Sequence, residues 1–337
     1  MAPVNLLIVG AGSRGTGYAS YAAAHPDEVQ IVGVAEPREI YRQRLIDEYS
    51  IAPENVFADW RAAAAVEKFA DAVVVATQDA MHVEPAEAFA AKGYHMLLEK
   101  PMAPDEEGCR RIHQAVKTAG VMLAVCHVVR YTTVTQKIKQ LLDQGAIGDI
   151  VSVQRLEPVG YWHQAHSFVR GNWRNEAESS AMLLAKSCHD VDWLRYILGV
   201  PCKKVSSFGN LKHFRAEQKP AGAAARCLDC DLASECAYAA QKIYLGRVRD
   251  GQTGWPVDVL TPDVDEEAVL QALREGPYGR CVYDCDNDVV DHQVVNFLFE
   301  SGATAAFTMT AFARGRGRET RIFGTKGELF SDDEKIE

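Results

Sequence analysis

The sequence predicts an α/β protein with a doubly wound parallel sheet over residues 1–126 and an α+β domain with a large open, mostly antiparallel sheet over residues 127–337. Up to Cys126, short apolar runs alternate with helix-compatible segments, the pattern of parallel strands joined by helices. A glycine-rich turn directly follows the first run. Beyond His127, longer extended segments alternate apolar and polar residues, as in a sheet with one covered face.

The glycine turn follows the first expected strand, Leu6 to Val9. Gly10, Gly12 and Gly15 form a G-x-G-x-x-G motif: the first makes the tight turn, the second lets the backbone approach a pyrophosphate, and the third lets helix and strand pack closely. Ser13 lies at the start of the next helix, where free amides bind anions. The motif therefore predicts a dinucleotide site.

The second expected strand, Val29 to Val34, is followed by Glu36, 21 residues after Gly15. A carboxylate at this position accepts hydrogen bonds from an adenosine ribose and repels a 2′-phosphate, which favours NAD over NADP. Arg14 and Arg38 leave the alternative open, because either guanidinium could reach a phosphate.

Strands and helices alternate through the rest of the first part. Further strands are expected at Asn55 to Phe57, Asp71 to Thr77, Tyr94 to Leu98 and Val121 to Cys126, and helices at Arg38 to Tyr49, Trp60 to Lys68, Glu84 to Lys92 and Asp105 to Ala119. Such sheets bind ligands beyond the carboxyl ends of their strands. Those ends carry Thr77, Glu99-Lys100-Pro101 and His127.

The second part begins with an expected helix and contains longer strands. The expected elements are helices at Thr132 to Gln144 and Met182 to Leu198, strands at Asp149 to Val159 and Lys203 to Asn210, and an antiparallel meander of His292 to Glu300, Thr304 to Ala313 and Glu319 to Phe323. A cysteine-rich, irregular segment covers about residues 220–254.

The amino-acid composition limits the classes of partner that the protein is expected to bind. A net charge of −10 argues against a nucleic-acid surface or an anionic membrane patch. No apolar run approaches the ~20 residues of a membrane span, and no basic segment or cleavage site precedes the first strand. We therefore expect a cytoplasmic protein with no nucleic-acid or membrane partner, whose nine cysteines are thiols or metal ligands.

Several motifs together resemble the Gfo/Idh/MocA superfamily of sugar and cyclitol oxidoreductases. They are G-A-G-S-R-G, A-E-P ending at Pro37, A-T-Q-D-A-M-H ending at His82, E-K-P ending at Pro101, H-V-V-R-Y from His127, G-A-I-G-D-I from Gly145, Trp173-Arg174, and His189 with Asp192. The resemblance covers roughly the full length, and E-K-P after a strand is its specific signal. It implies a Rossmann NAD-binding domain, an open-sheet domain for substrate binding and oligomerisation, and commonly a homodimer or homotetramer.

The resemblance implies that Lys100 lies beside the nicotinamide and the reacting hydroxyl, and that His189 faces it. Members typically carry an Asp four residues before that His, but position 185 is Ala here, so Lys186 is the candidate to replace part of the proton relay. On a continuous helix Lys186 and His189 are one turn apart, and a nearby ammonium would lower the imidazole pKa. Relatives usually run on beyond Gly327, so the chain is either short or lacks the last strand and helix.

The resemblance and the residue types give a full set of site candidates. The cofactor candidates are Gly10, Gly12, Ser13, Arg14, Gly15, Glu36, Thr77, His82, Glu99, Lys100, Pro101 and His127. The substrate candidates are Arg130, Tyr131, Tyr161, Trp162, His163, His166, Arg170, Trp173, Arg174 and Lys186, since aromatic rings stack on a sugar face and polar groups bind its hydroxyls. The cations Arg170, Arg174 and Lys186 suggest an anionic group on the substrate, whereas His163-x-x-His166 could instead bind a metal.

The cysteine-rich segment carries a possible structural zinc site. Cys227, Cys230 and Cys236 supply three thiolates, and Cys281 or Cys285 could supply the fourth. Free thiols are the alternative.

Three functions remain open from the sequence. The first is an NAD-dependent dehydrogenase of a sugar or sugar derivative, in which Lys100 polarises the hydroxyl and His189 takes its proton. The second is a redox-neutral NAD-dependent glycosidase that transiently oxidises a sugar, eliminates the aglycone, adds water and reduces the product back. The third is a non-catalytic NAD-binding regulator.

Overall fold

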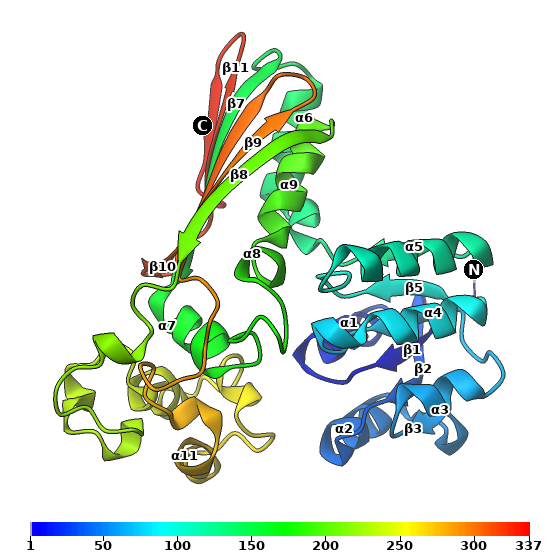
Figure 1. Ribbon diagram of the computed structural model, residues 1–337. Helices are drawn as coiled ribbons and strands as arrows, with labels where there is room; N and C mark the ends of the chain where they lie inside the picture. The colour runs from blue at the N-terminus through cyan, green and yellow to red at the C-terminus, as the bar shows by residue number, and fades with distance from the viewer. Residues whose placement is uncertain (1) are drawn as a thin grey trace. The chain divides into compact units, whose positions relative to one another are not determined.

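The computed structural model describes residues 2–337 and divides the chain into unit 1 (Met1–Cys126) and unit 2 (His127–Glu337). Unit 1 contains a six-stranded parallel sheet, sheet A, in the order β3-β2-β1-β4-β5-β6 (Figure 1). Its strands are β1 (Val4–Val9), β2 (Val29–Ala35), β3 (Val56–Phe57), β4 (Ala72–Val75), β5 (His95–Leu98) and β6 (Leu123–Val125). Its helices are α1 (Ser13–Ala24), α2 (Glu39–Tyr49), α3 (Trp60–Ala65), α4 (Val83–Ala91) and α5 (Glu106–Ala119). The predicted doubly wound parallel sheet is confirmed.

The continuous apolar run of β1 is explained by burial on both faces of sheet A. Leu7 and Val9 pack into the core that also holds Phe89 of α4 and Ile112 of α5. Ile8 points to the opposite face, into the core that α1 and α2 cover. Parallel strands enclosed in this way read as unbroken hydrophobic segments.

Unit 2 is built on sheet B, a six-stranded sheet in the order β12-β11-β7-β10-β9-β8. Its strands are β7 (Ile150–Gly160), β8 (Cys202–Asn210), β9 (His292–Phe299), β10 (Thr304–Ala313), β11 (Glu319–Gly324) and β12 (Glu328–Ser331). Its helices are α6 (Thr133–Asp143), α7 (Tyr161–His163), α8 (Met182–Ala185), α9 (Cys188–Leu198), α10 (Gly246–Arg249) and α11 (Glu266–Glu275). All strand pairs are antiparallel except β7 with β10, so the predicted mostly antiparallel sheet is confirmed.

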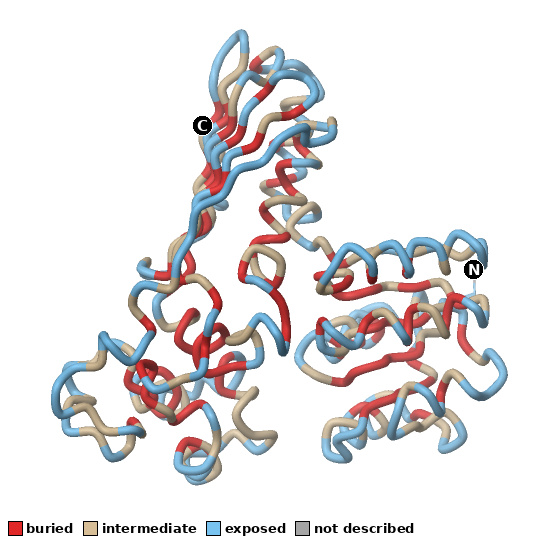
Figure 2. The backbone as a smooth tube through the Cα atoms, in the orientation of Figure 1, coloured by how far each residue is buried: buried red, intermediate tan, exposed pale blue. Residues whose placement is uncertain are grey.

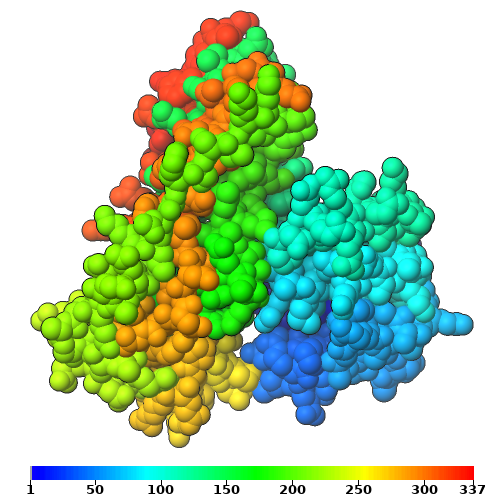
Figure 3. Space-filling model, in the orientation of Figure 1, coloured from blue at the N-terminus to red at the C-terminus, as the bar shows by residue number. Residues whose placement is uncertain are grey.

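One face of sheet B packs against α6 and α9, with Trp193 and Phe307 among the buried side chains. Figure 2 shows the resulting alternation of buried and exposed residues along the strands, and β8 exposed over its whole length at the sheet edge. Residues 211–280 form a lobe with its own core, at the opposite end of unit 2 from the turn between β11 and β12 (Figure 3).

Two details of the predicted unit 2 are wrong. The expected meander fails because β11 pairs with β7 rather than with β10. The connection between β10 and β11 passes the end of β7: Gly315 has φ +83°, and a Cβ atom on it would lie 3.3 Å from the Cα of Gly160. The expected single helix Met182 to Leu198 is broken at Lys186 and Ser187, because Ser187 leaves the helical conformation before α9 begins.

Candidate functional site

The glycine turn between β1 and α1 is closely packed on two sides and open on a third. A Cβ atom on Gly10 would lie 2.6 Å from the carbonyl oxygen of Ala76, and one on Gly15 would lie 1.9 Å from that of Gly10. A Cβ atom on Gly12 would meet only the guanidinium of Arg38, at 3.6 Å. Gly12 also offers no side chain to cap the first amides of α1. The turn therefore leaves helix-start amides for an anion, as a dinucleotide pyrophosphate requires.

Glu36 fixes the end of β2 to this turn. Its carboxylate is only 2% exposed and accepts hydrogen bonds from the amide of Ala11 at 2.7 Å and from Arg38 Nε at 2.7 Å. Burial alone would raise the pKa of Glu36, but the hydrogen bonds from Arg38 and Ala11 hold it below its usual value. Arg38 also stacks on Tyr41, 4.0 Å from the ring centre, so a cation covers the carboxylate predicted to meet the ribose.

Glu99 connects the turn after β5 to α1. Its carboxylate accepts hydrogen bonds from Arg14 Nε at 2.6 Å, from the Tyr18 hydroxyl at 2.7 Å and from the amide of Lys100 at 2.9 Å. The guanidinium of Arg14 is therefore paired with the carboxylate of Glu99. Lys100 follows Glu99 directly. The buried carboxylate of Glu99 therefore contacts both the glycine turn, through Arg14, and the E-K-P turn, through the amide of Lys100.

His82 joins two other strand ends. Its side chain is fully buried, with Nδ1 2.8 Å from the carbonyl oxygen of Pro101 and Nε2 3.1 Å from that of Thr77. The imidazole therefore links the E-K-P turn to the end of β4. Because it is buried with both ring nitrogens in contact with protein carbonyls, its role is structural rather than ligand-binding.

In unit 2, Asp192 organises the residues around His189. It forms an ion pair with Arg130, whose Nε lies 2.6 Å from Oδ2, and its Oδ1 lies 3.8 Å from His127 Nε2. The rings of His127 and His189 meet edge to face, 6.3 Å between centroids. Tyr131, beside this group, is 75% exposed. The structure thus brings His127 close to both Asp192 and His189, and Arg130 close to Asp192.

A buried chain of charges that the sequence analysis missed begins at Lys186. Lys186 Nζ lies 3.4 Å from Glu157 Oε1, and Glu157 Oε2 lies 2.6 Å from Arg318 Nη2. Arg318 Nε and Arg155 Nε each lie 2.7 Å from Asp190 Oδ1. The available signal was the spacing of Arg155 and Glu157, two residues apart on the face of β7 that packs inward.

Burial and neighbouring charges shift the pKa values of two of these charged side chains. Burial lowers the pKa of Lys186, Glu157 opposes the change, and Arg318 adds to it. Burial alone would raise the pKa of Asp190, but Arg318 and Arg155 hold it below its usual value. Burial therefore disfavours the charged form of Lys186, whereas the two arginines favour the ionised form of Asp190.

The aromatic segment after β7 packs mostly onto the lobe of unit 2. His166 is 2% exposed and its Nδ1 lies 3.0 Å from the Tyr244 hydroxyl; burial lowers its pKa to about 3. Trp162 and His163 lie 5.3 and 4.9 Å from the Trp255 ring, while Tyr161 lies 6.2 Å from that of Tyr238. Trp173 packs 6.2 Å from Phe168. These rings form an aromatic cluster in which Tyr161 and Trp255 remain 36% and 41% exposed, whereas His166 is a buried, structural residue.

Two arginines predicted to bind an anionic substrate have internal partners. Arg170 is 1% exposed and donates hydrogen bonds to the carbonyl oxygens of Arg280 at 2.8 Å and Tyr238 at 2.9 Å. Arg174 forms ion pairs with Glu178 at 2.9 Å and Asp286 at 3.0 Å. Both guanidiniums therefore hold the fold of the lobe.

The structure does not support the predicted zinc site. Cys227, Cys230, Cys236 and Cys281 do line one small cavity of about 40 Å³, but within residues 2–337 no group of three or more His, Cys, Asp or Glu side chains is placed to hold a metal ion. Arg170 lines the same cavity, and its charge opposes a cation there. Burial also raises the pKa of Cys281, which favours the thiol over the metal-binding thiolate. The prediction of zinc is therefore withdrawn, and so is the His163-x-x-His166 alternative.

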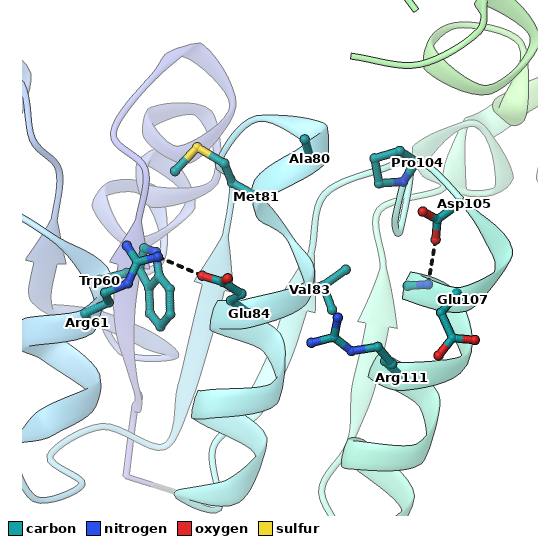
Figure 4. A pocket seen from close by; sticks show the side chains of 11 residues that line it. Trp60, Arg61, Ala80, Met81, Val83, Glu84, Pro104, Asp105, Glu107 and Arg111 are labelled. Carbon is teal, nitrogen blue, oxygen red and sulfur yellow. Dashed lines mark hydrogen bonds and ion pairs between the residues drawn. The ribbon is translucent and has the colours of Figure 1, made fainter. Parts of the chain in front are cut away.

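A cavity of about 490 Å³ in unit 1 lies apart from these residues. It is lined from the first turns of α3, α4 and α5, with Trp60, Met81 and Pro104 beside the Arg61–Glu84 ion pair (Figure 4). None of the predicted cofactor residues lines it. Every helix within residues 2–337 is too short or too polar to span a bilayer.

An open glycine turn, a buried carboxylate after the second strand and an anchored turn after the fifth define a dinucleotide-binding protein of the doubly wound class. Residues 4–127 match a protein-family model that is described as an oxidoreductase family with an NAD-binding Rossmann fold. Residues 139–337 match the C-terminal α/β domain of the same family. The chain belongs to the Gfo/Idh/MocA family of oxidoreductases, so the resemblance seen in the sequence is confirmed.

Three similar proteins illustrate the variety of proteins in this family. YteT of Bacillus subtilis is 25% identical over 267 residues, which cover 78% of this chain and 60% of YteT. The 2,7-anhydro-N-acetylneuraminate hydratase of Escherichia coli is 31% identical over 147 residues, or 43% of this chain and 38% of the relative. The WlbA dehydrogenase of Bordetella pertussis, solved with NADH and UDP-GlcNAcA, has a TM-score of 0.68 at 19% identity and shares the fold over 100% of this chain and 76% of its own. The chain thus spans about two fifths to three fifths of these curated relatives.

Proposed function

We propose that the protein is an NAD-dependent oxidoreductase that acts on a secondary hydroxyl of a sugar or sugar derivative. The observation that carries the proposal is the shared framework of the two cofactor turns, in which Glu99 holds both Arg14 of the glycine turn and the amide of Lys100. The open side of Gly12 and the uncapped start of α1 fit a dinucleotide pyrophosphate.

The residues of this chain take separate roles in the proposal. The nicotinamide, when bound, accepts a hydride. The amides of Gly12 and Ser13 hold the pyrophosphate, Glu36 meets the ribose and selects NAD, and Lys100 stabilises negative charge on the reacting oxygen. His189 takes the hydroxyl proton, and Asp192 orients its neighbours Arg130 and His127.

A sugar-type substrate is supported by what the relatives are named for. They include a levoglucosan dehydrogenase and an inositol 2-dehydrogenase. An anionic group on the substrate has less support, because Arg170 and Arg174 already have internal partners. Neutral and acidic forms of one sugar, compared by titration calorimetry, are expected to bind with similar affinity.

A redox-neutral glycosidase is the second candidate function. The observation that favours it is the 31% identity to a hydratase of an anhydro sugar. A dehydrogenase forms one NADH for each product, whereas the glycosidase releases aglycone with catalytic NAD and no net change in absorbance.

The test is a screen of free sugars and glycosides with added NAD, in which NADH and released sugar are both measured. Replacing Lys100 with Met is expected to lower kcat at least ~100-fold while NADH binding remains, since a positioned charge at the reacting oxygen is lost. Unchanged turnover in the Lys100→Met variant would instead indicate a different site, whereas NADH binding without turnover of any sugar or glycoside by the wild type would favour a non-catalytic regulator.

We also propose that the outer face of sheet B forms a homodimer. Phe208 is 73% exposed and lies beside Val294, which is 41% exposed, and both belong to a row that continues through Thr308 to Leu156. An apolar row across an open sheet is suited to pairing with a second copy. Light scattering during size-exclusion chromatography measures the assembly directly, and a monomer would refute the proposal.

A further inference from the structure

Donors from two parts of unit 1 hold the carboxylate of Glu99. Its Oε1 atom accepts hydrogen bonds from Arg14 Nε at 2.6 Å and from the Tyr18 hydroxyl at 2.7 Å, and its Oε2 atom accepts one from the amide of Lys100 at 2.9 Å. The side chain of Glu99 is only 6% exposed. Because each oxygen has its own donors, the plane of the carboxylate is fixed, and so is the backbone amide that follows it.

Tyr18 and Arg14 do not contribute equally to this arrangement. The side chain of Arg14 is 53% exposed, so water competes for its guanidinium. Tyr18, from the second turn of α1, is half-buried, and its ring centre lies 4.7 Å from the Arg14 guanidinium. Its hydroxyl accepts a hydrogen bond from Arg14 Nη2 as well as donating to Glu99. Tyr18 therefore holds both the carboxylate and the other side chain that donates to Oε1.

The hydroxyl of Tyr18 lies where α1 meets the ends of β5 and β6. Cys126, which follows β6 and is 4% exposed, lies beside this hydroxyl. Burial raises the pKa of Tyr18, and the neighbouring Cys126 and Glu99 raise it further, so Tyr18 keeps a proton to donate at neutral pH. Burial raises the pKa of Cys126 to about 11, although the charge of Lys100 opposes the change. Lys100 therefore lies within electrostatic range of the same junction.

We propose that Tyr18 is a positioning residue for Lys100: its hydroxyl holds the carboxylate of Glu99, and Glu99 holds the turn that presents the Lys100 ammonium to the reacting oxygen. The inference rests on the proposed function, in which Lys100 stabilises negative charge on that oxygen. Tyr18 acts through Glu99 and Lys100 rather than on the substrate. The same hydrogen bonds connect α1, whose first amides face the pyrophosphate, with the residue at the reacting atoms.

The test compares two tyrosines of α1 in the full-length protein. Tyr18→Phe removes only the hydroxyl that donates to Glu99. Tyr21→Phe is the matched control, because Tyr21 is 47% exposed and donates to Glu28 at 2.8 Å, a carboxylate outside the E-K-P turn. Unfolding curves show whether each variant folds. If Tyr18→Phe does not fold, Arg14→Met takes its place, since it removes the other side-chain donor to Oε1.

The first measurement needs no substrate: it is hydrogen–deuterium exchange of the Lys100 amide, read by mass spectrometry. A loosened carboxylate releases this amide, so Tyr18→Phe is expected to exchange it roughly fivefold faster than the wild type, the factor that one hydrogen bond contributes. Tyr21→Phe leaves the rate unchanged. Pro101 has no amide hydrogen, so exchange at this turn is readily assigned to Lys100. Equal rates in Tyr18→Phe and the wild type overturn the proposal.

The second measurement uses the sugar or glycoside identified in the screen with NAD. Tyr18→Phe is expected to lower kcat by about tenfold or more, with KM and NADH binding unchanged, because a displacement of ~1 Å near the reacting atoms can cost ~100-fold. Tyr18→Phe is then added to Lys100→Met. A residue that acts only through Lys100 causes no further loss there, whereas the same loss in both backgrounds overturns the proposal. An equal loss of kcat in Tyr21→Phe also overturns it.

The two measurements separate this inference from the proposed function. Faster exchange of the Lys100 amide in Tyr18→Phe, with no turnover of any sugar or glycoside by the wild type, refutes the proposed function and supports the hold of Tyr18 on the E-K-P turn. Turnover by the wild type with an unchanged kcat in Tyr18→Phe refutes the role of Tyr18 and leaves the proposed function in place.

Discussion

Substituting the third glycine of the motif tests whether the glycine turn is the dinucleotide site. A Cβ atom on Gly15 would lie 1.9 Å from the carbonyl oxygen of Gly10. Non-bonded heavy atoms prefer about 3.5 Å, so in Gly15→Ala the start of α1 must move by roughly 1.5 Å. Such overpacking costs about 1–3 kcal/mol, and it displaces the amides that face the pyrophosphate. We expect lower stability and at least about tenfold weaker NADH binding, since 1.4 kcal/mol corresponds to tenfold.

Gly17→Ala is the matched control, because it adds the same atom two residues along α1. A Cβ atom on Gly17 meets nothing within 4 Å. Alanine is a better helix former than glycine by about 0.5–1 kcal/mol, so this variant should be slightly more stable and bind NADH normally. NADH fluorescence titration and denaturant unfolding measure both effects. If Gly15→Ala bound NADH as tightly as Gly17→Ala, the turn would not be the pyrophosphate site.

Three further predictions follow from contacts described above. Arg38→Ala should uncover the negative charge of Glu36 and weaken NADP binding about tenfold more than NAD binding, by titration calorimetry; equal losses would contradict this role. Asp190→Asn should destabilise the protein by about 3–5 kcal/mol in denaturant, because it removes the ion-pair partner of the buried Arg155 and one of the two carboxylates paired with Arg318, and a loss near zero would show that the site relaxes. Because the pKa of Asp190 is held below its usual value, its contribution is present above the unfolded pKa and is lost as pH falls through the folded pKa. Phe208→Glu should yield a monomer by light scattering, with NADH binding intact.

The sequence predicted unit 1 well because its signals are local. An unbroken apolar strand, three glycines at fixed spacing and a carboxylate after the second strand each report on their own surroundings. The E-K-P turn was also located, but its attachment through Glu99 to Arg14 joins residues 85 positions apart. No local pattern encodes that contact.

Unit 2 shows where such patterns fail. The periodicity of residues 182–198 favours one helix, yet Lys186 is drawn into an ion pair with Glu157 and the helix breaks beside it. Arg170 lies among aromatic residues in the sequence, which suggested a sugar site, but tertiary packing encloses it in the lobe. Charge-bearing residues in an extended segment also look exposed, although Arg155 is buried and neutralised by a distant aspartate.

The pairing of β7 has a consequence for how the chain folds. Ser152 of β7 pairs with Thr304 of β10, and Val153 pairs with Ile322 of β11, so the interior strand of sheet B depends on partners from the last tenth of the sequence. Sheet A, by contrast, is complete by Val125. During synthesis the dinucleotide domain can therefore form first, whereas β7 must wait beside an incomplete sheet until nearly the whole polypeptide has been made.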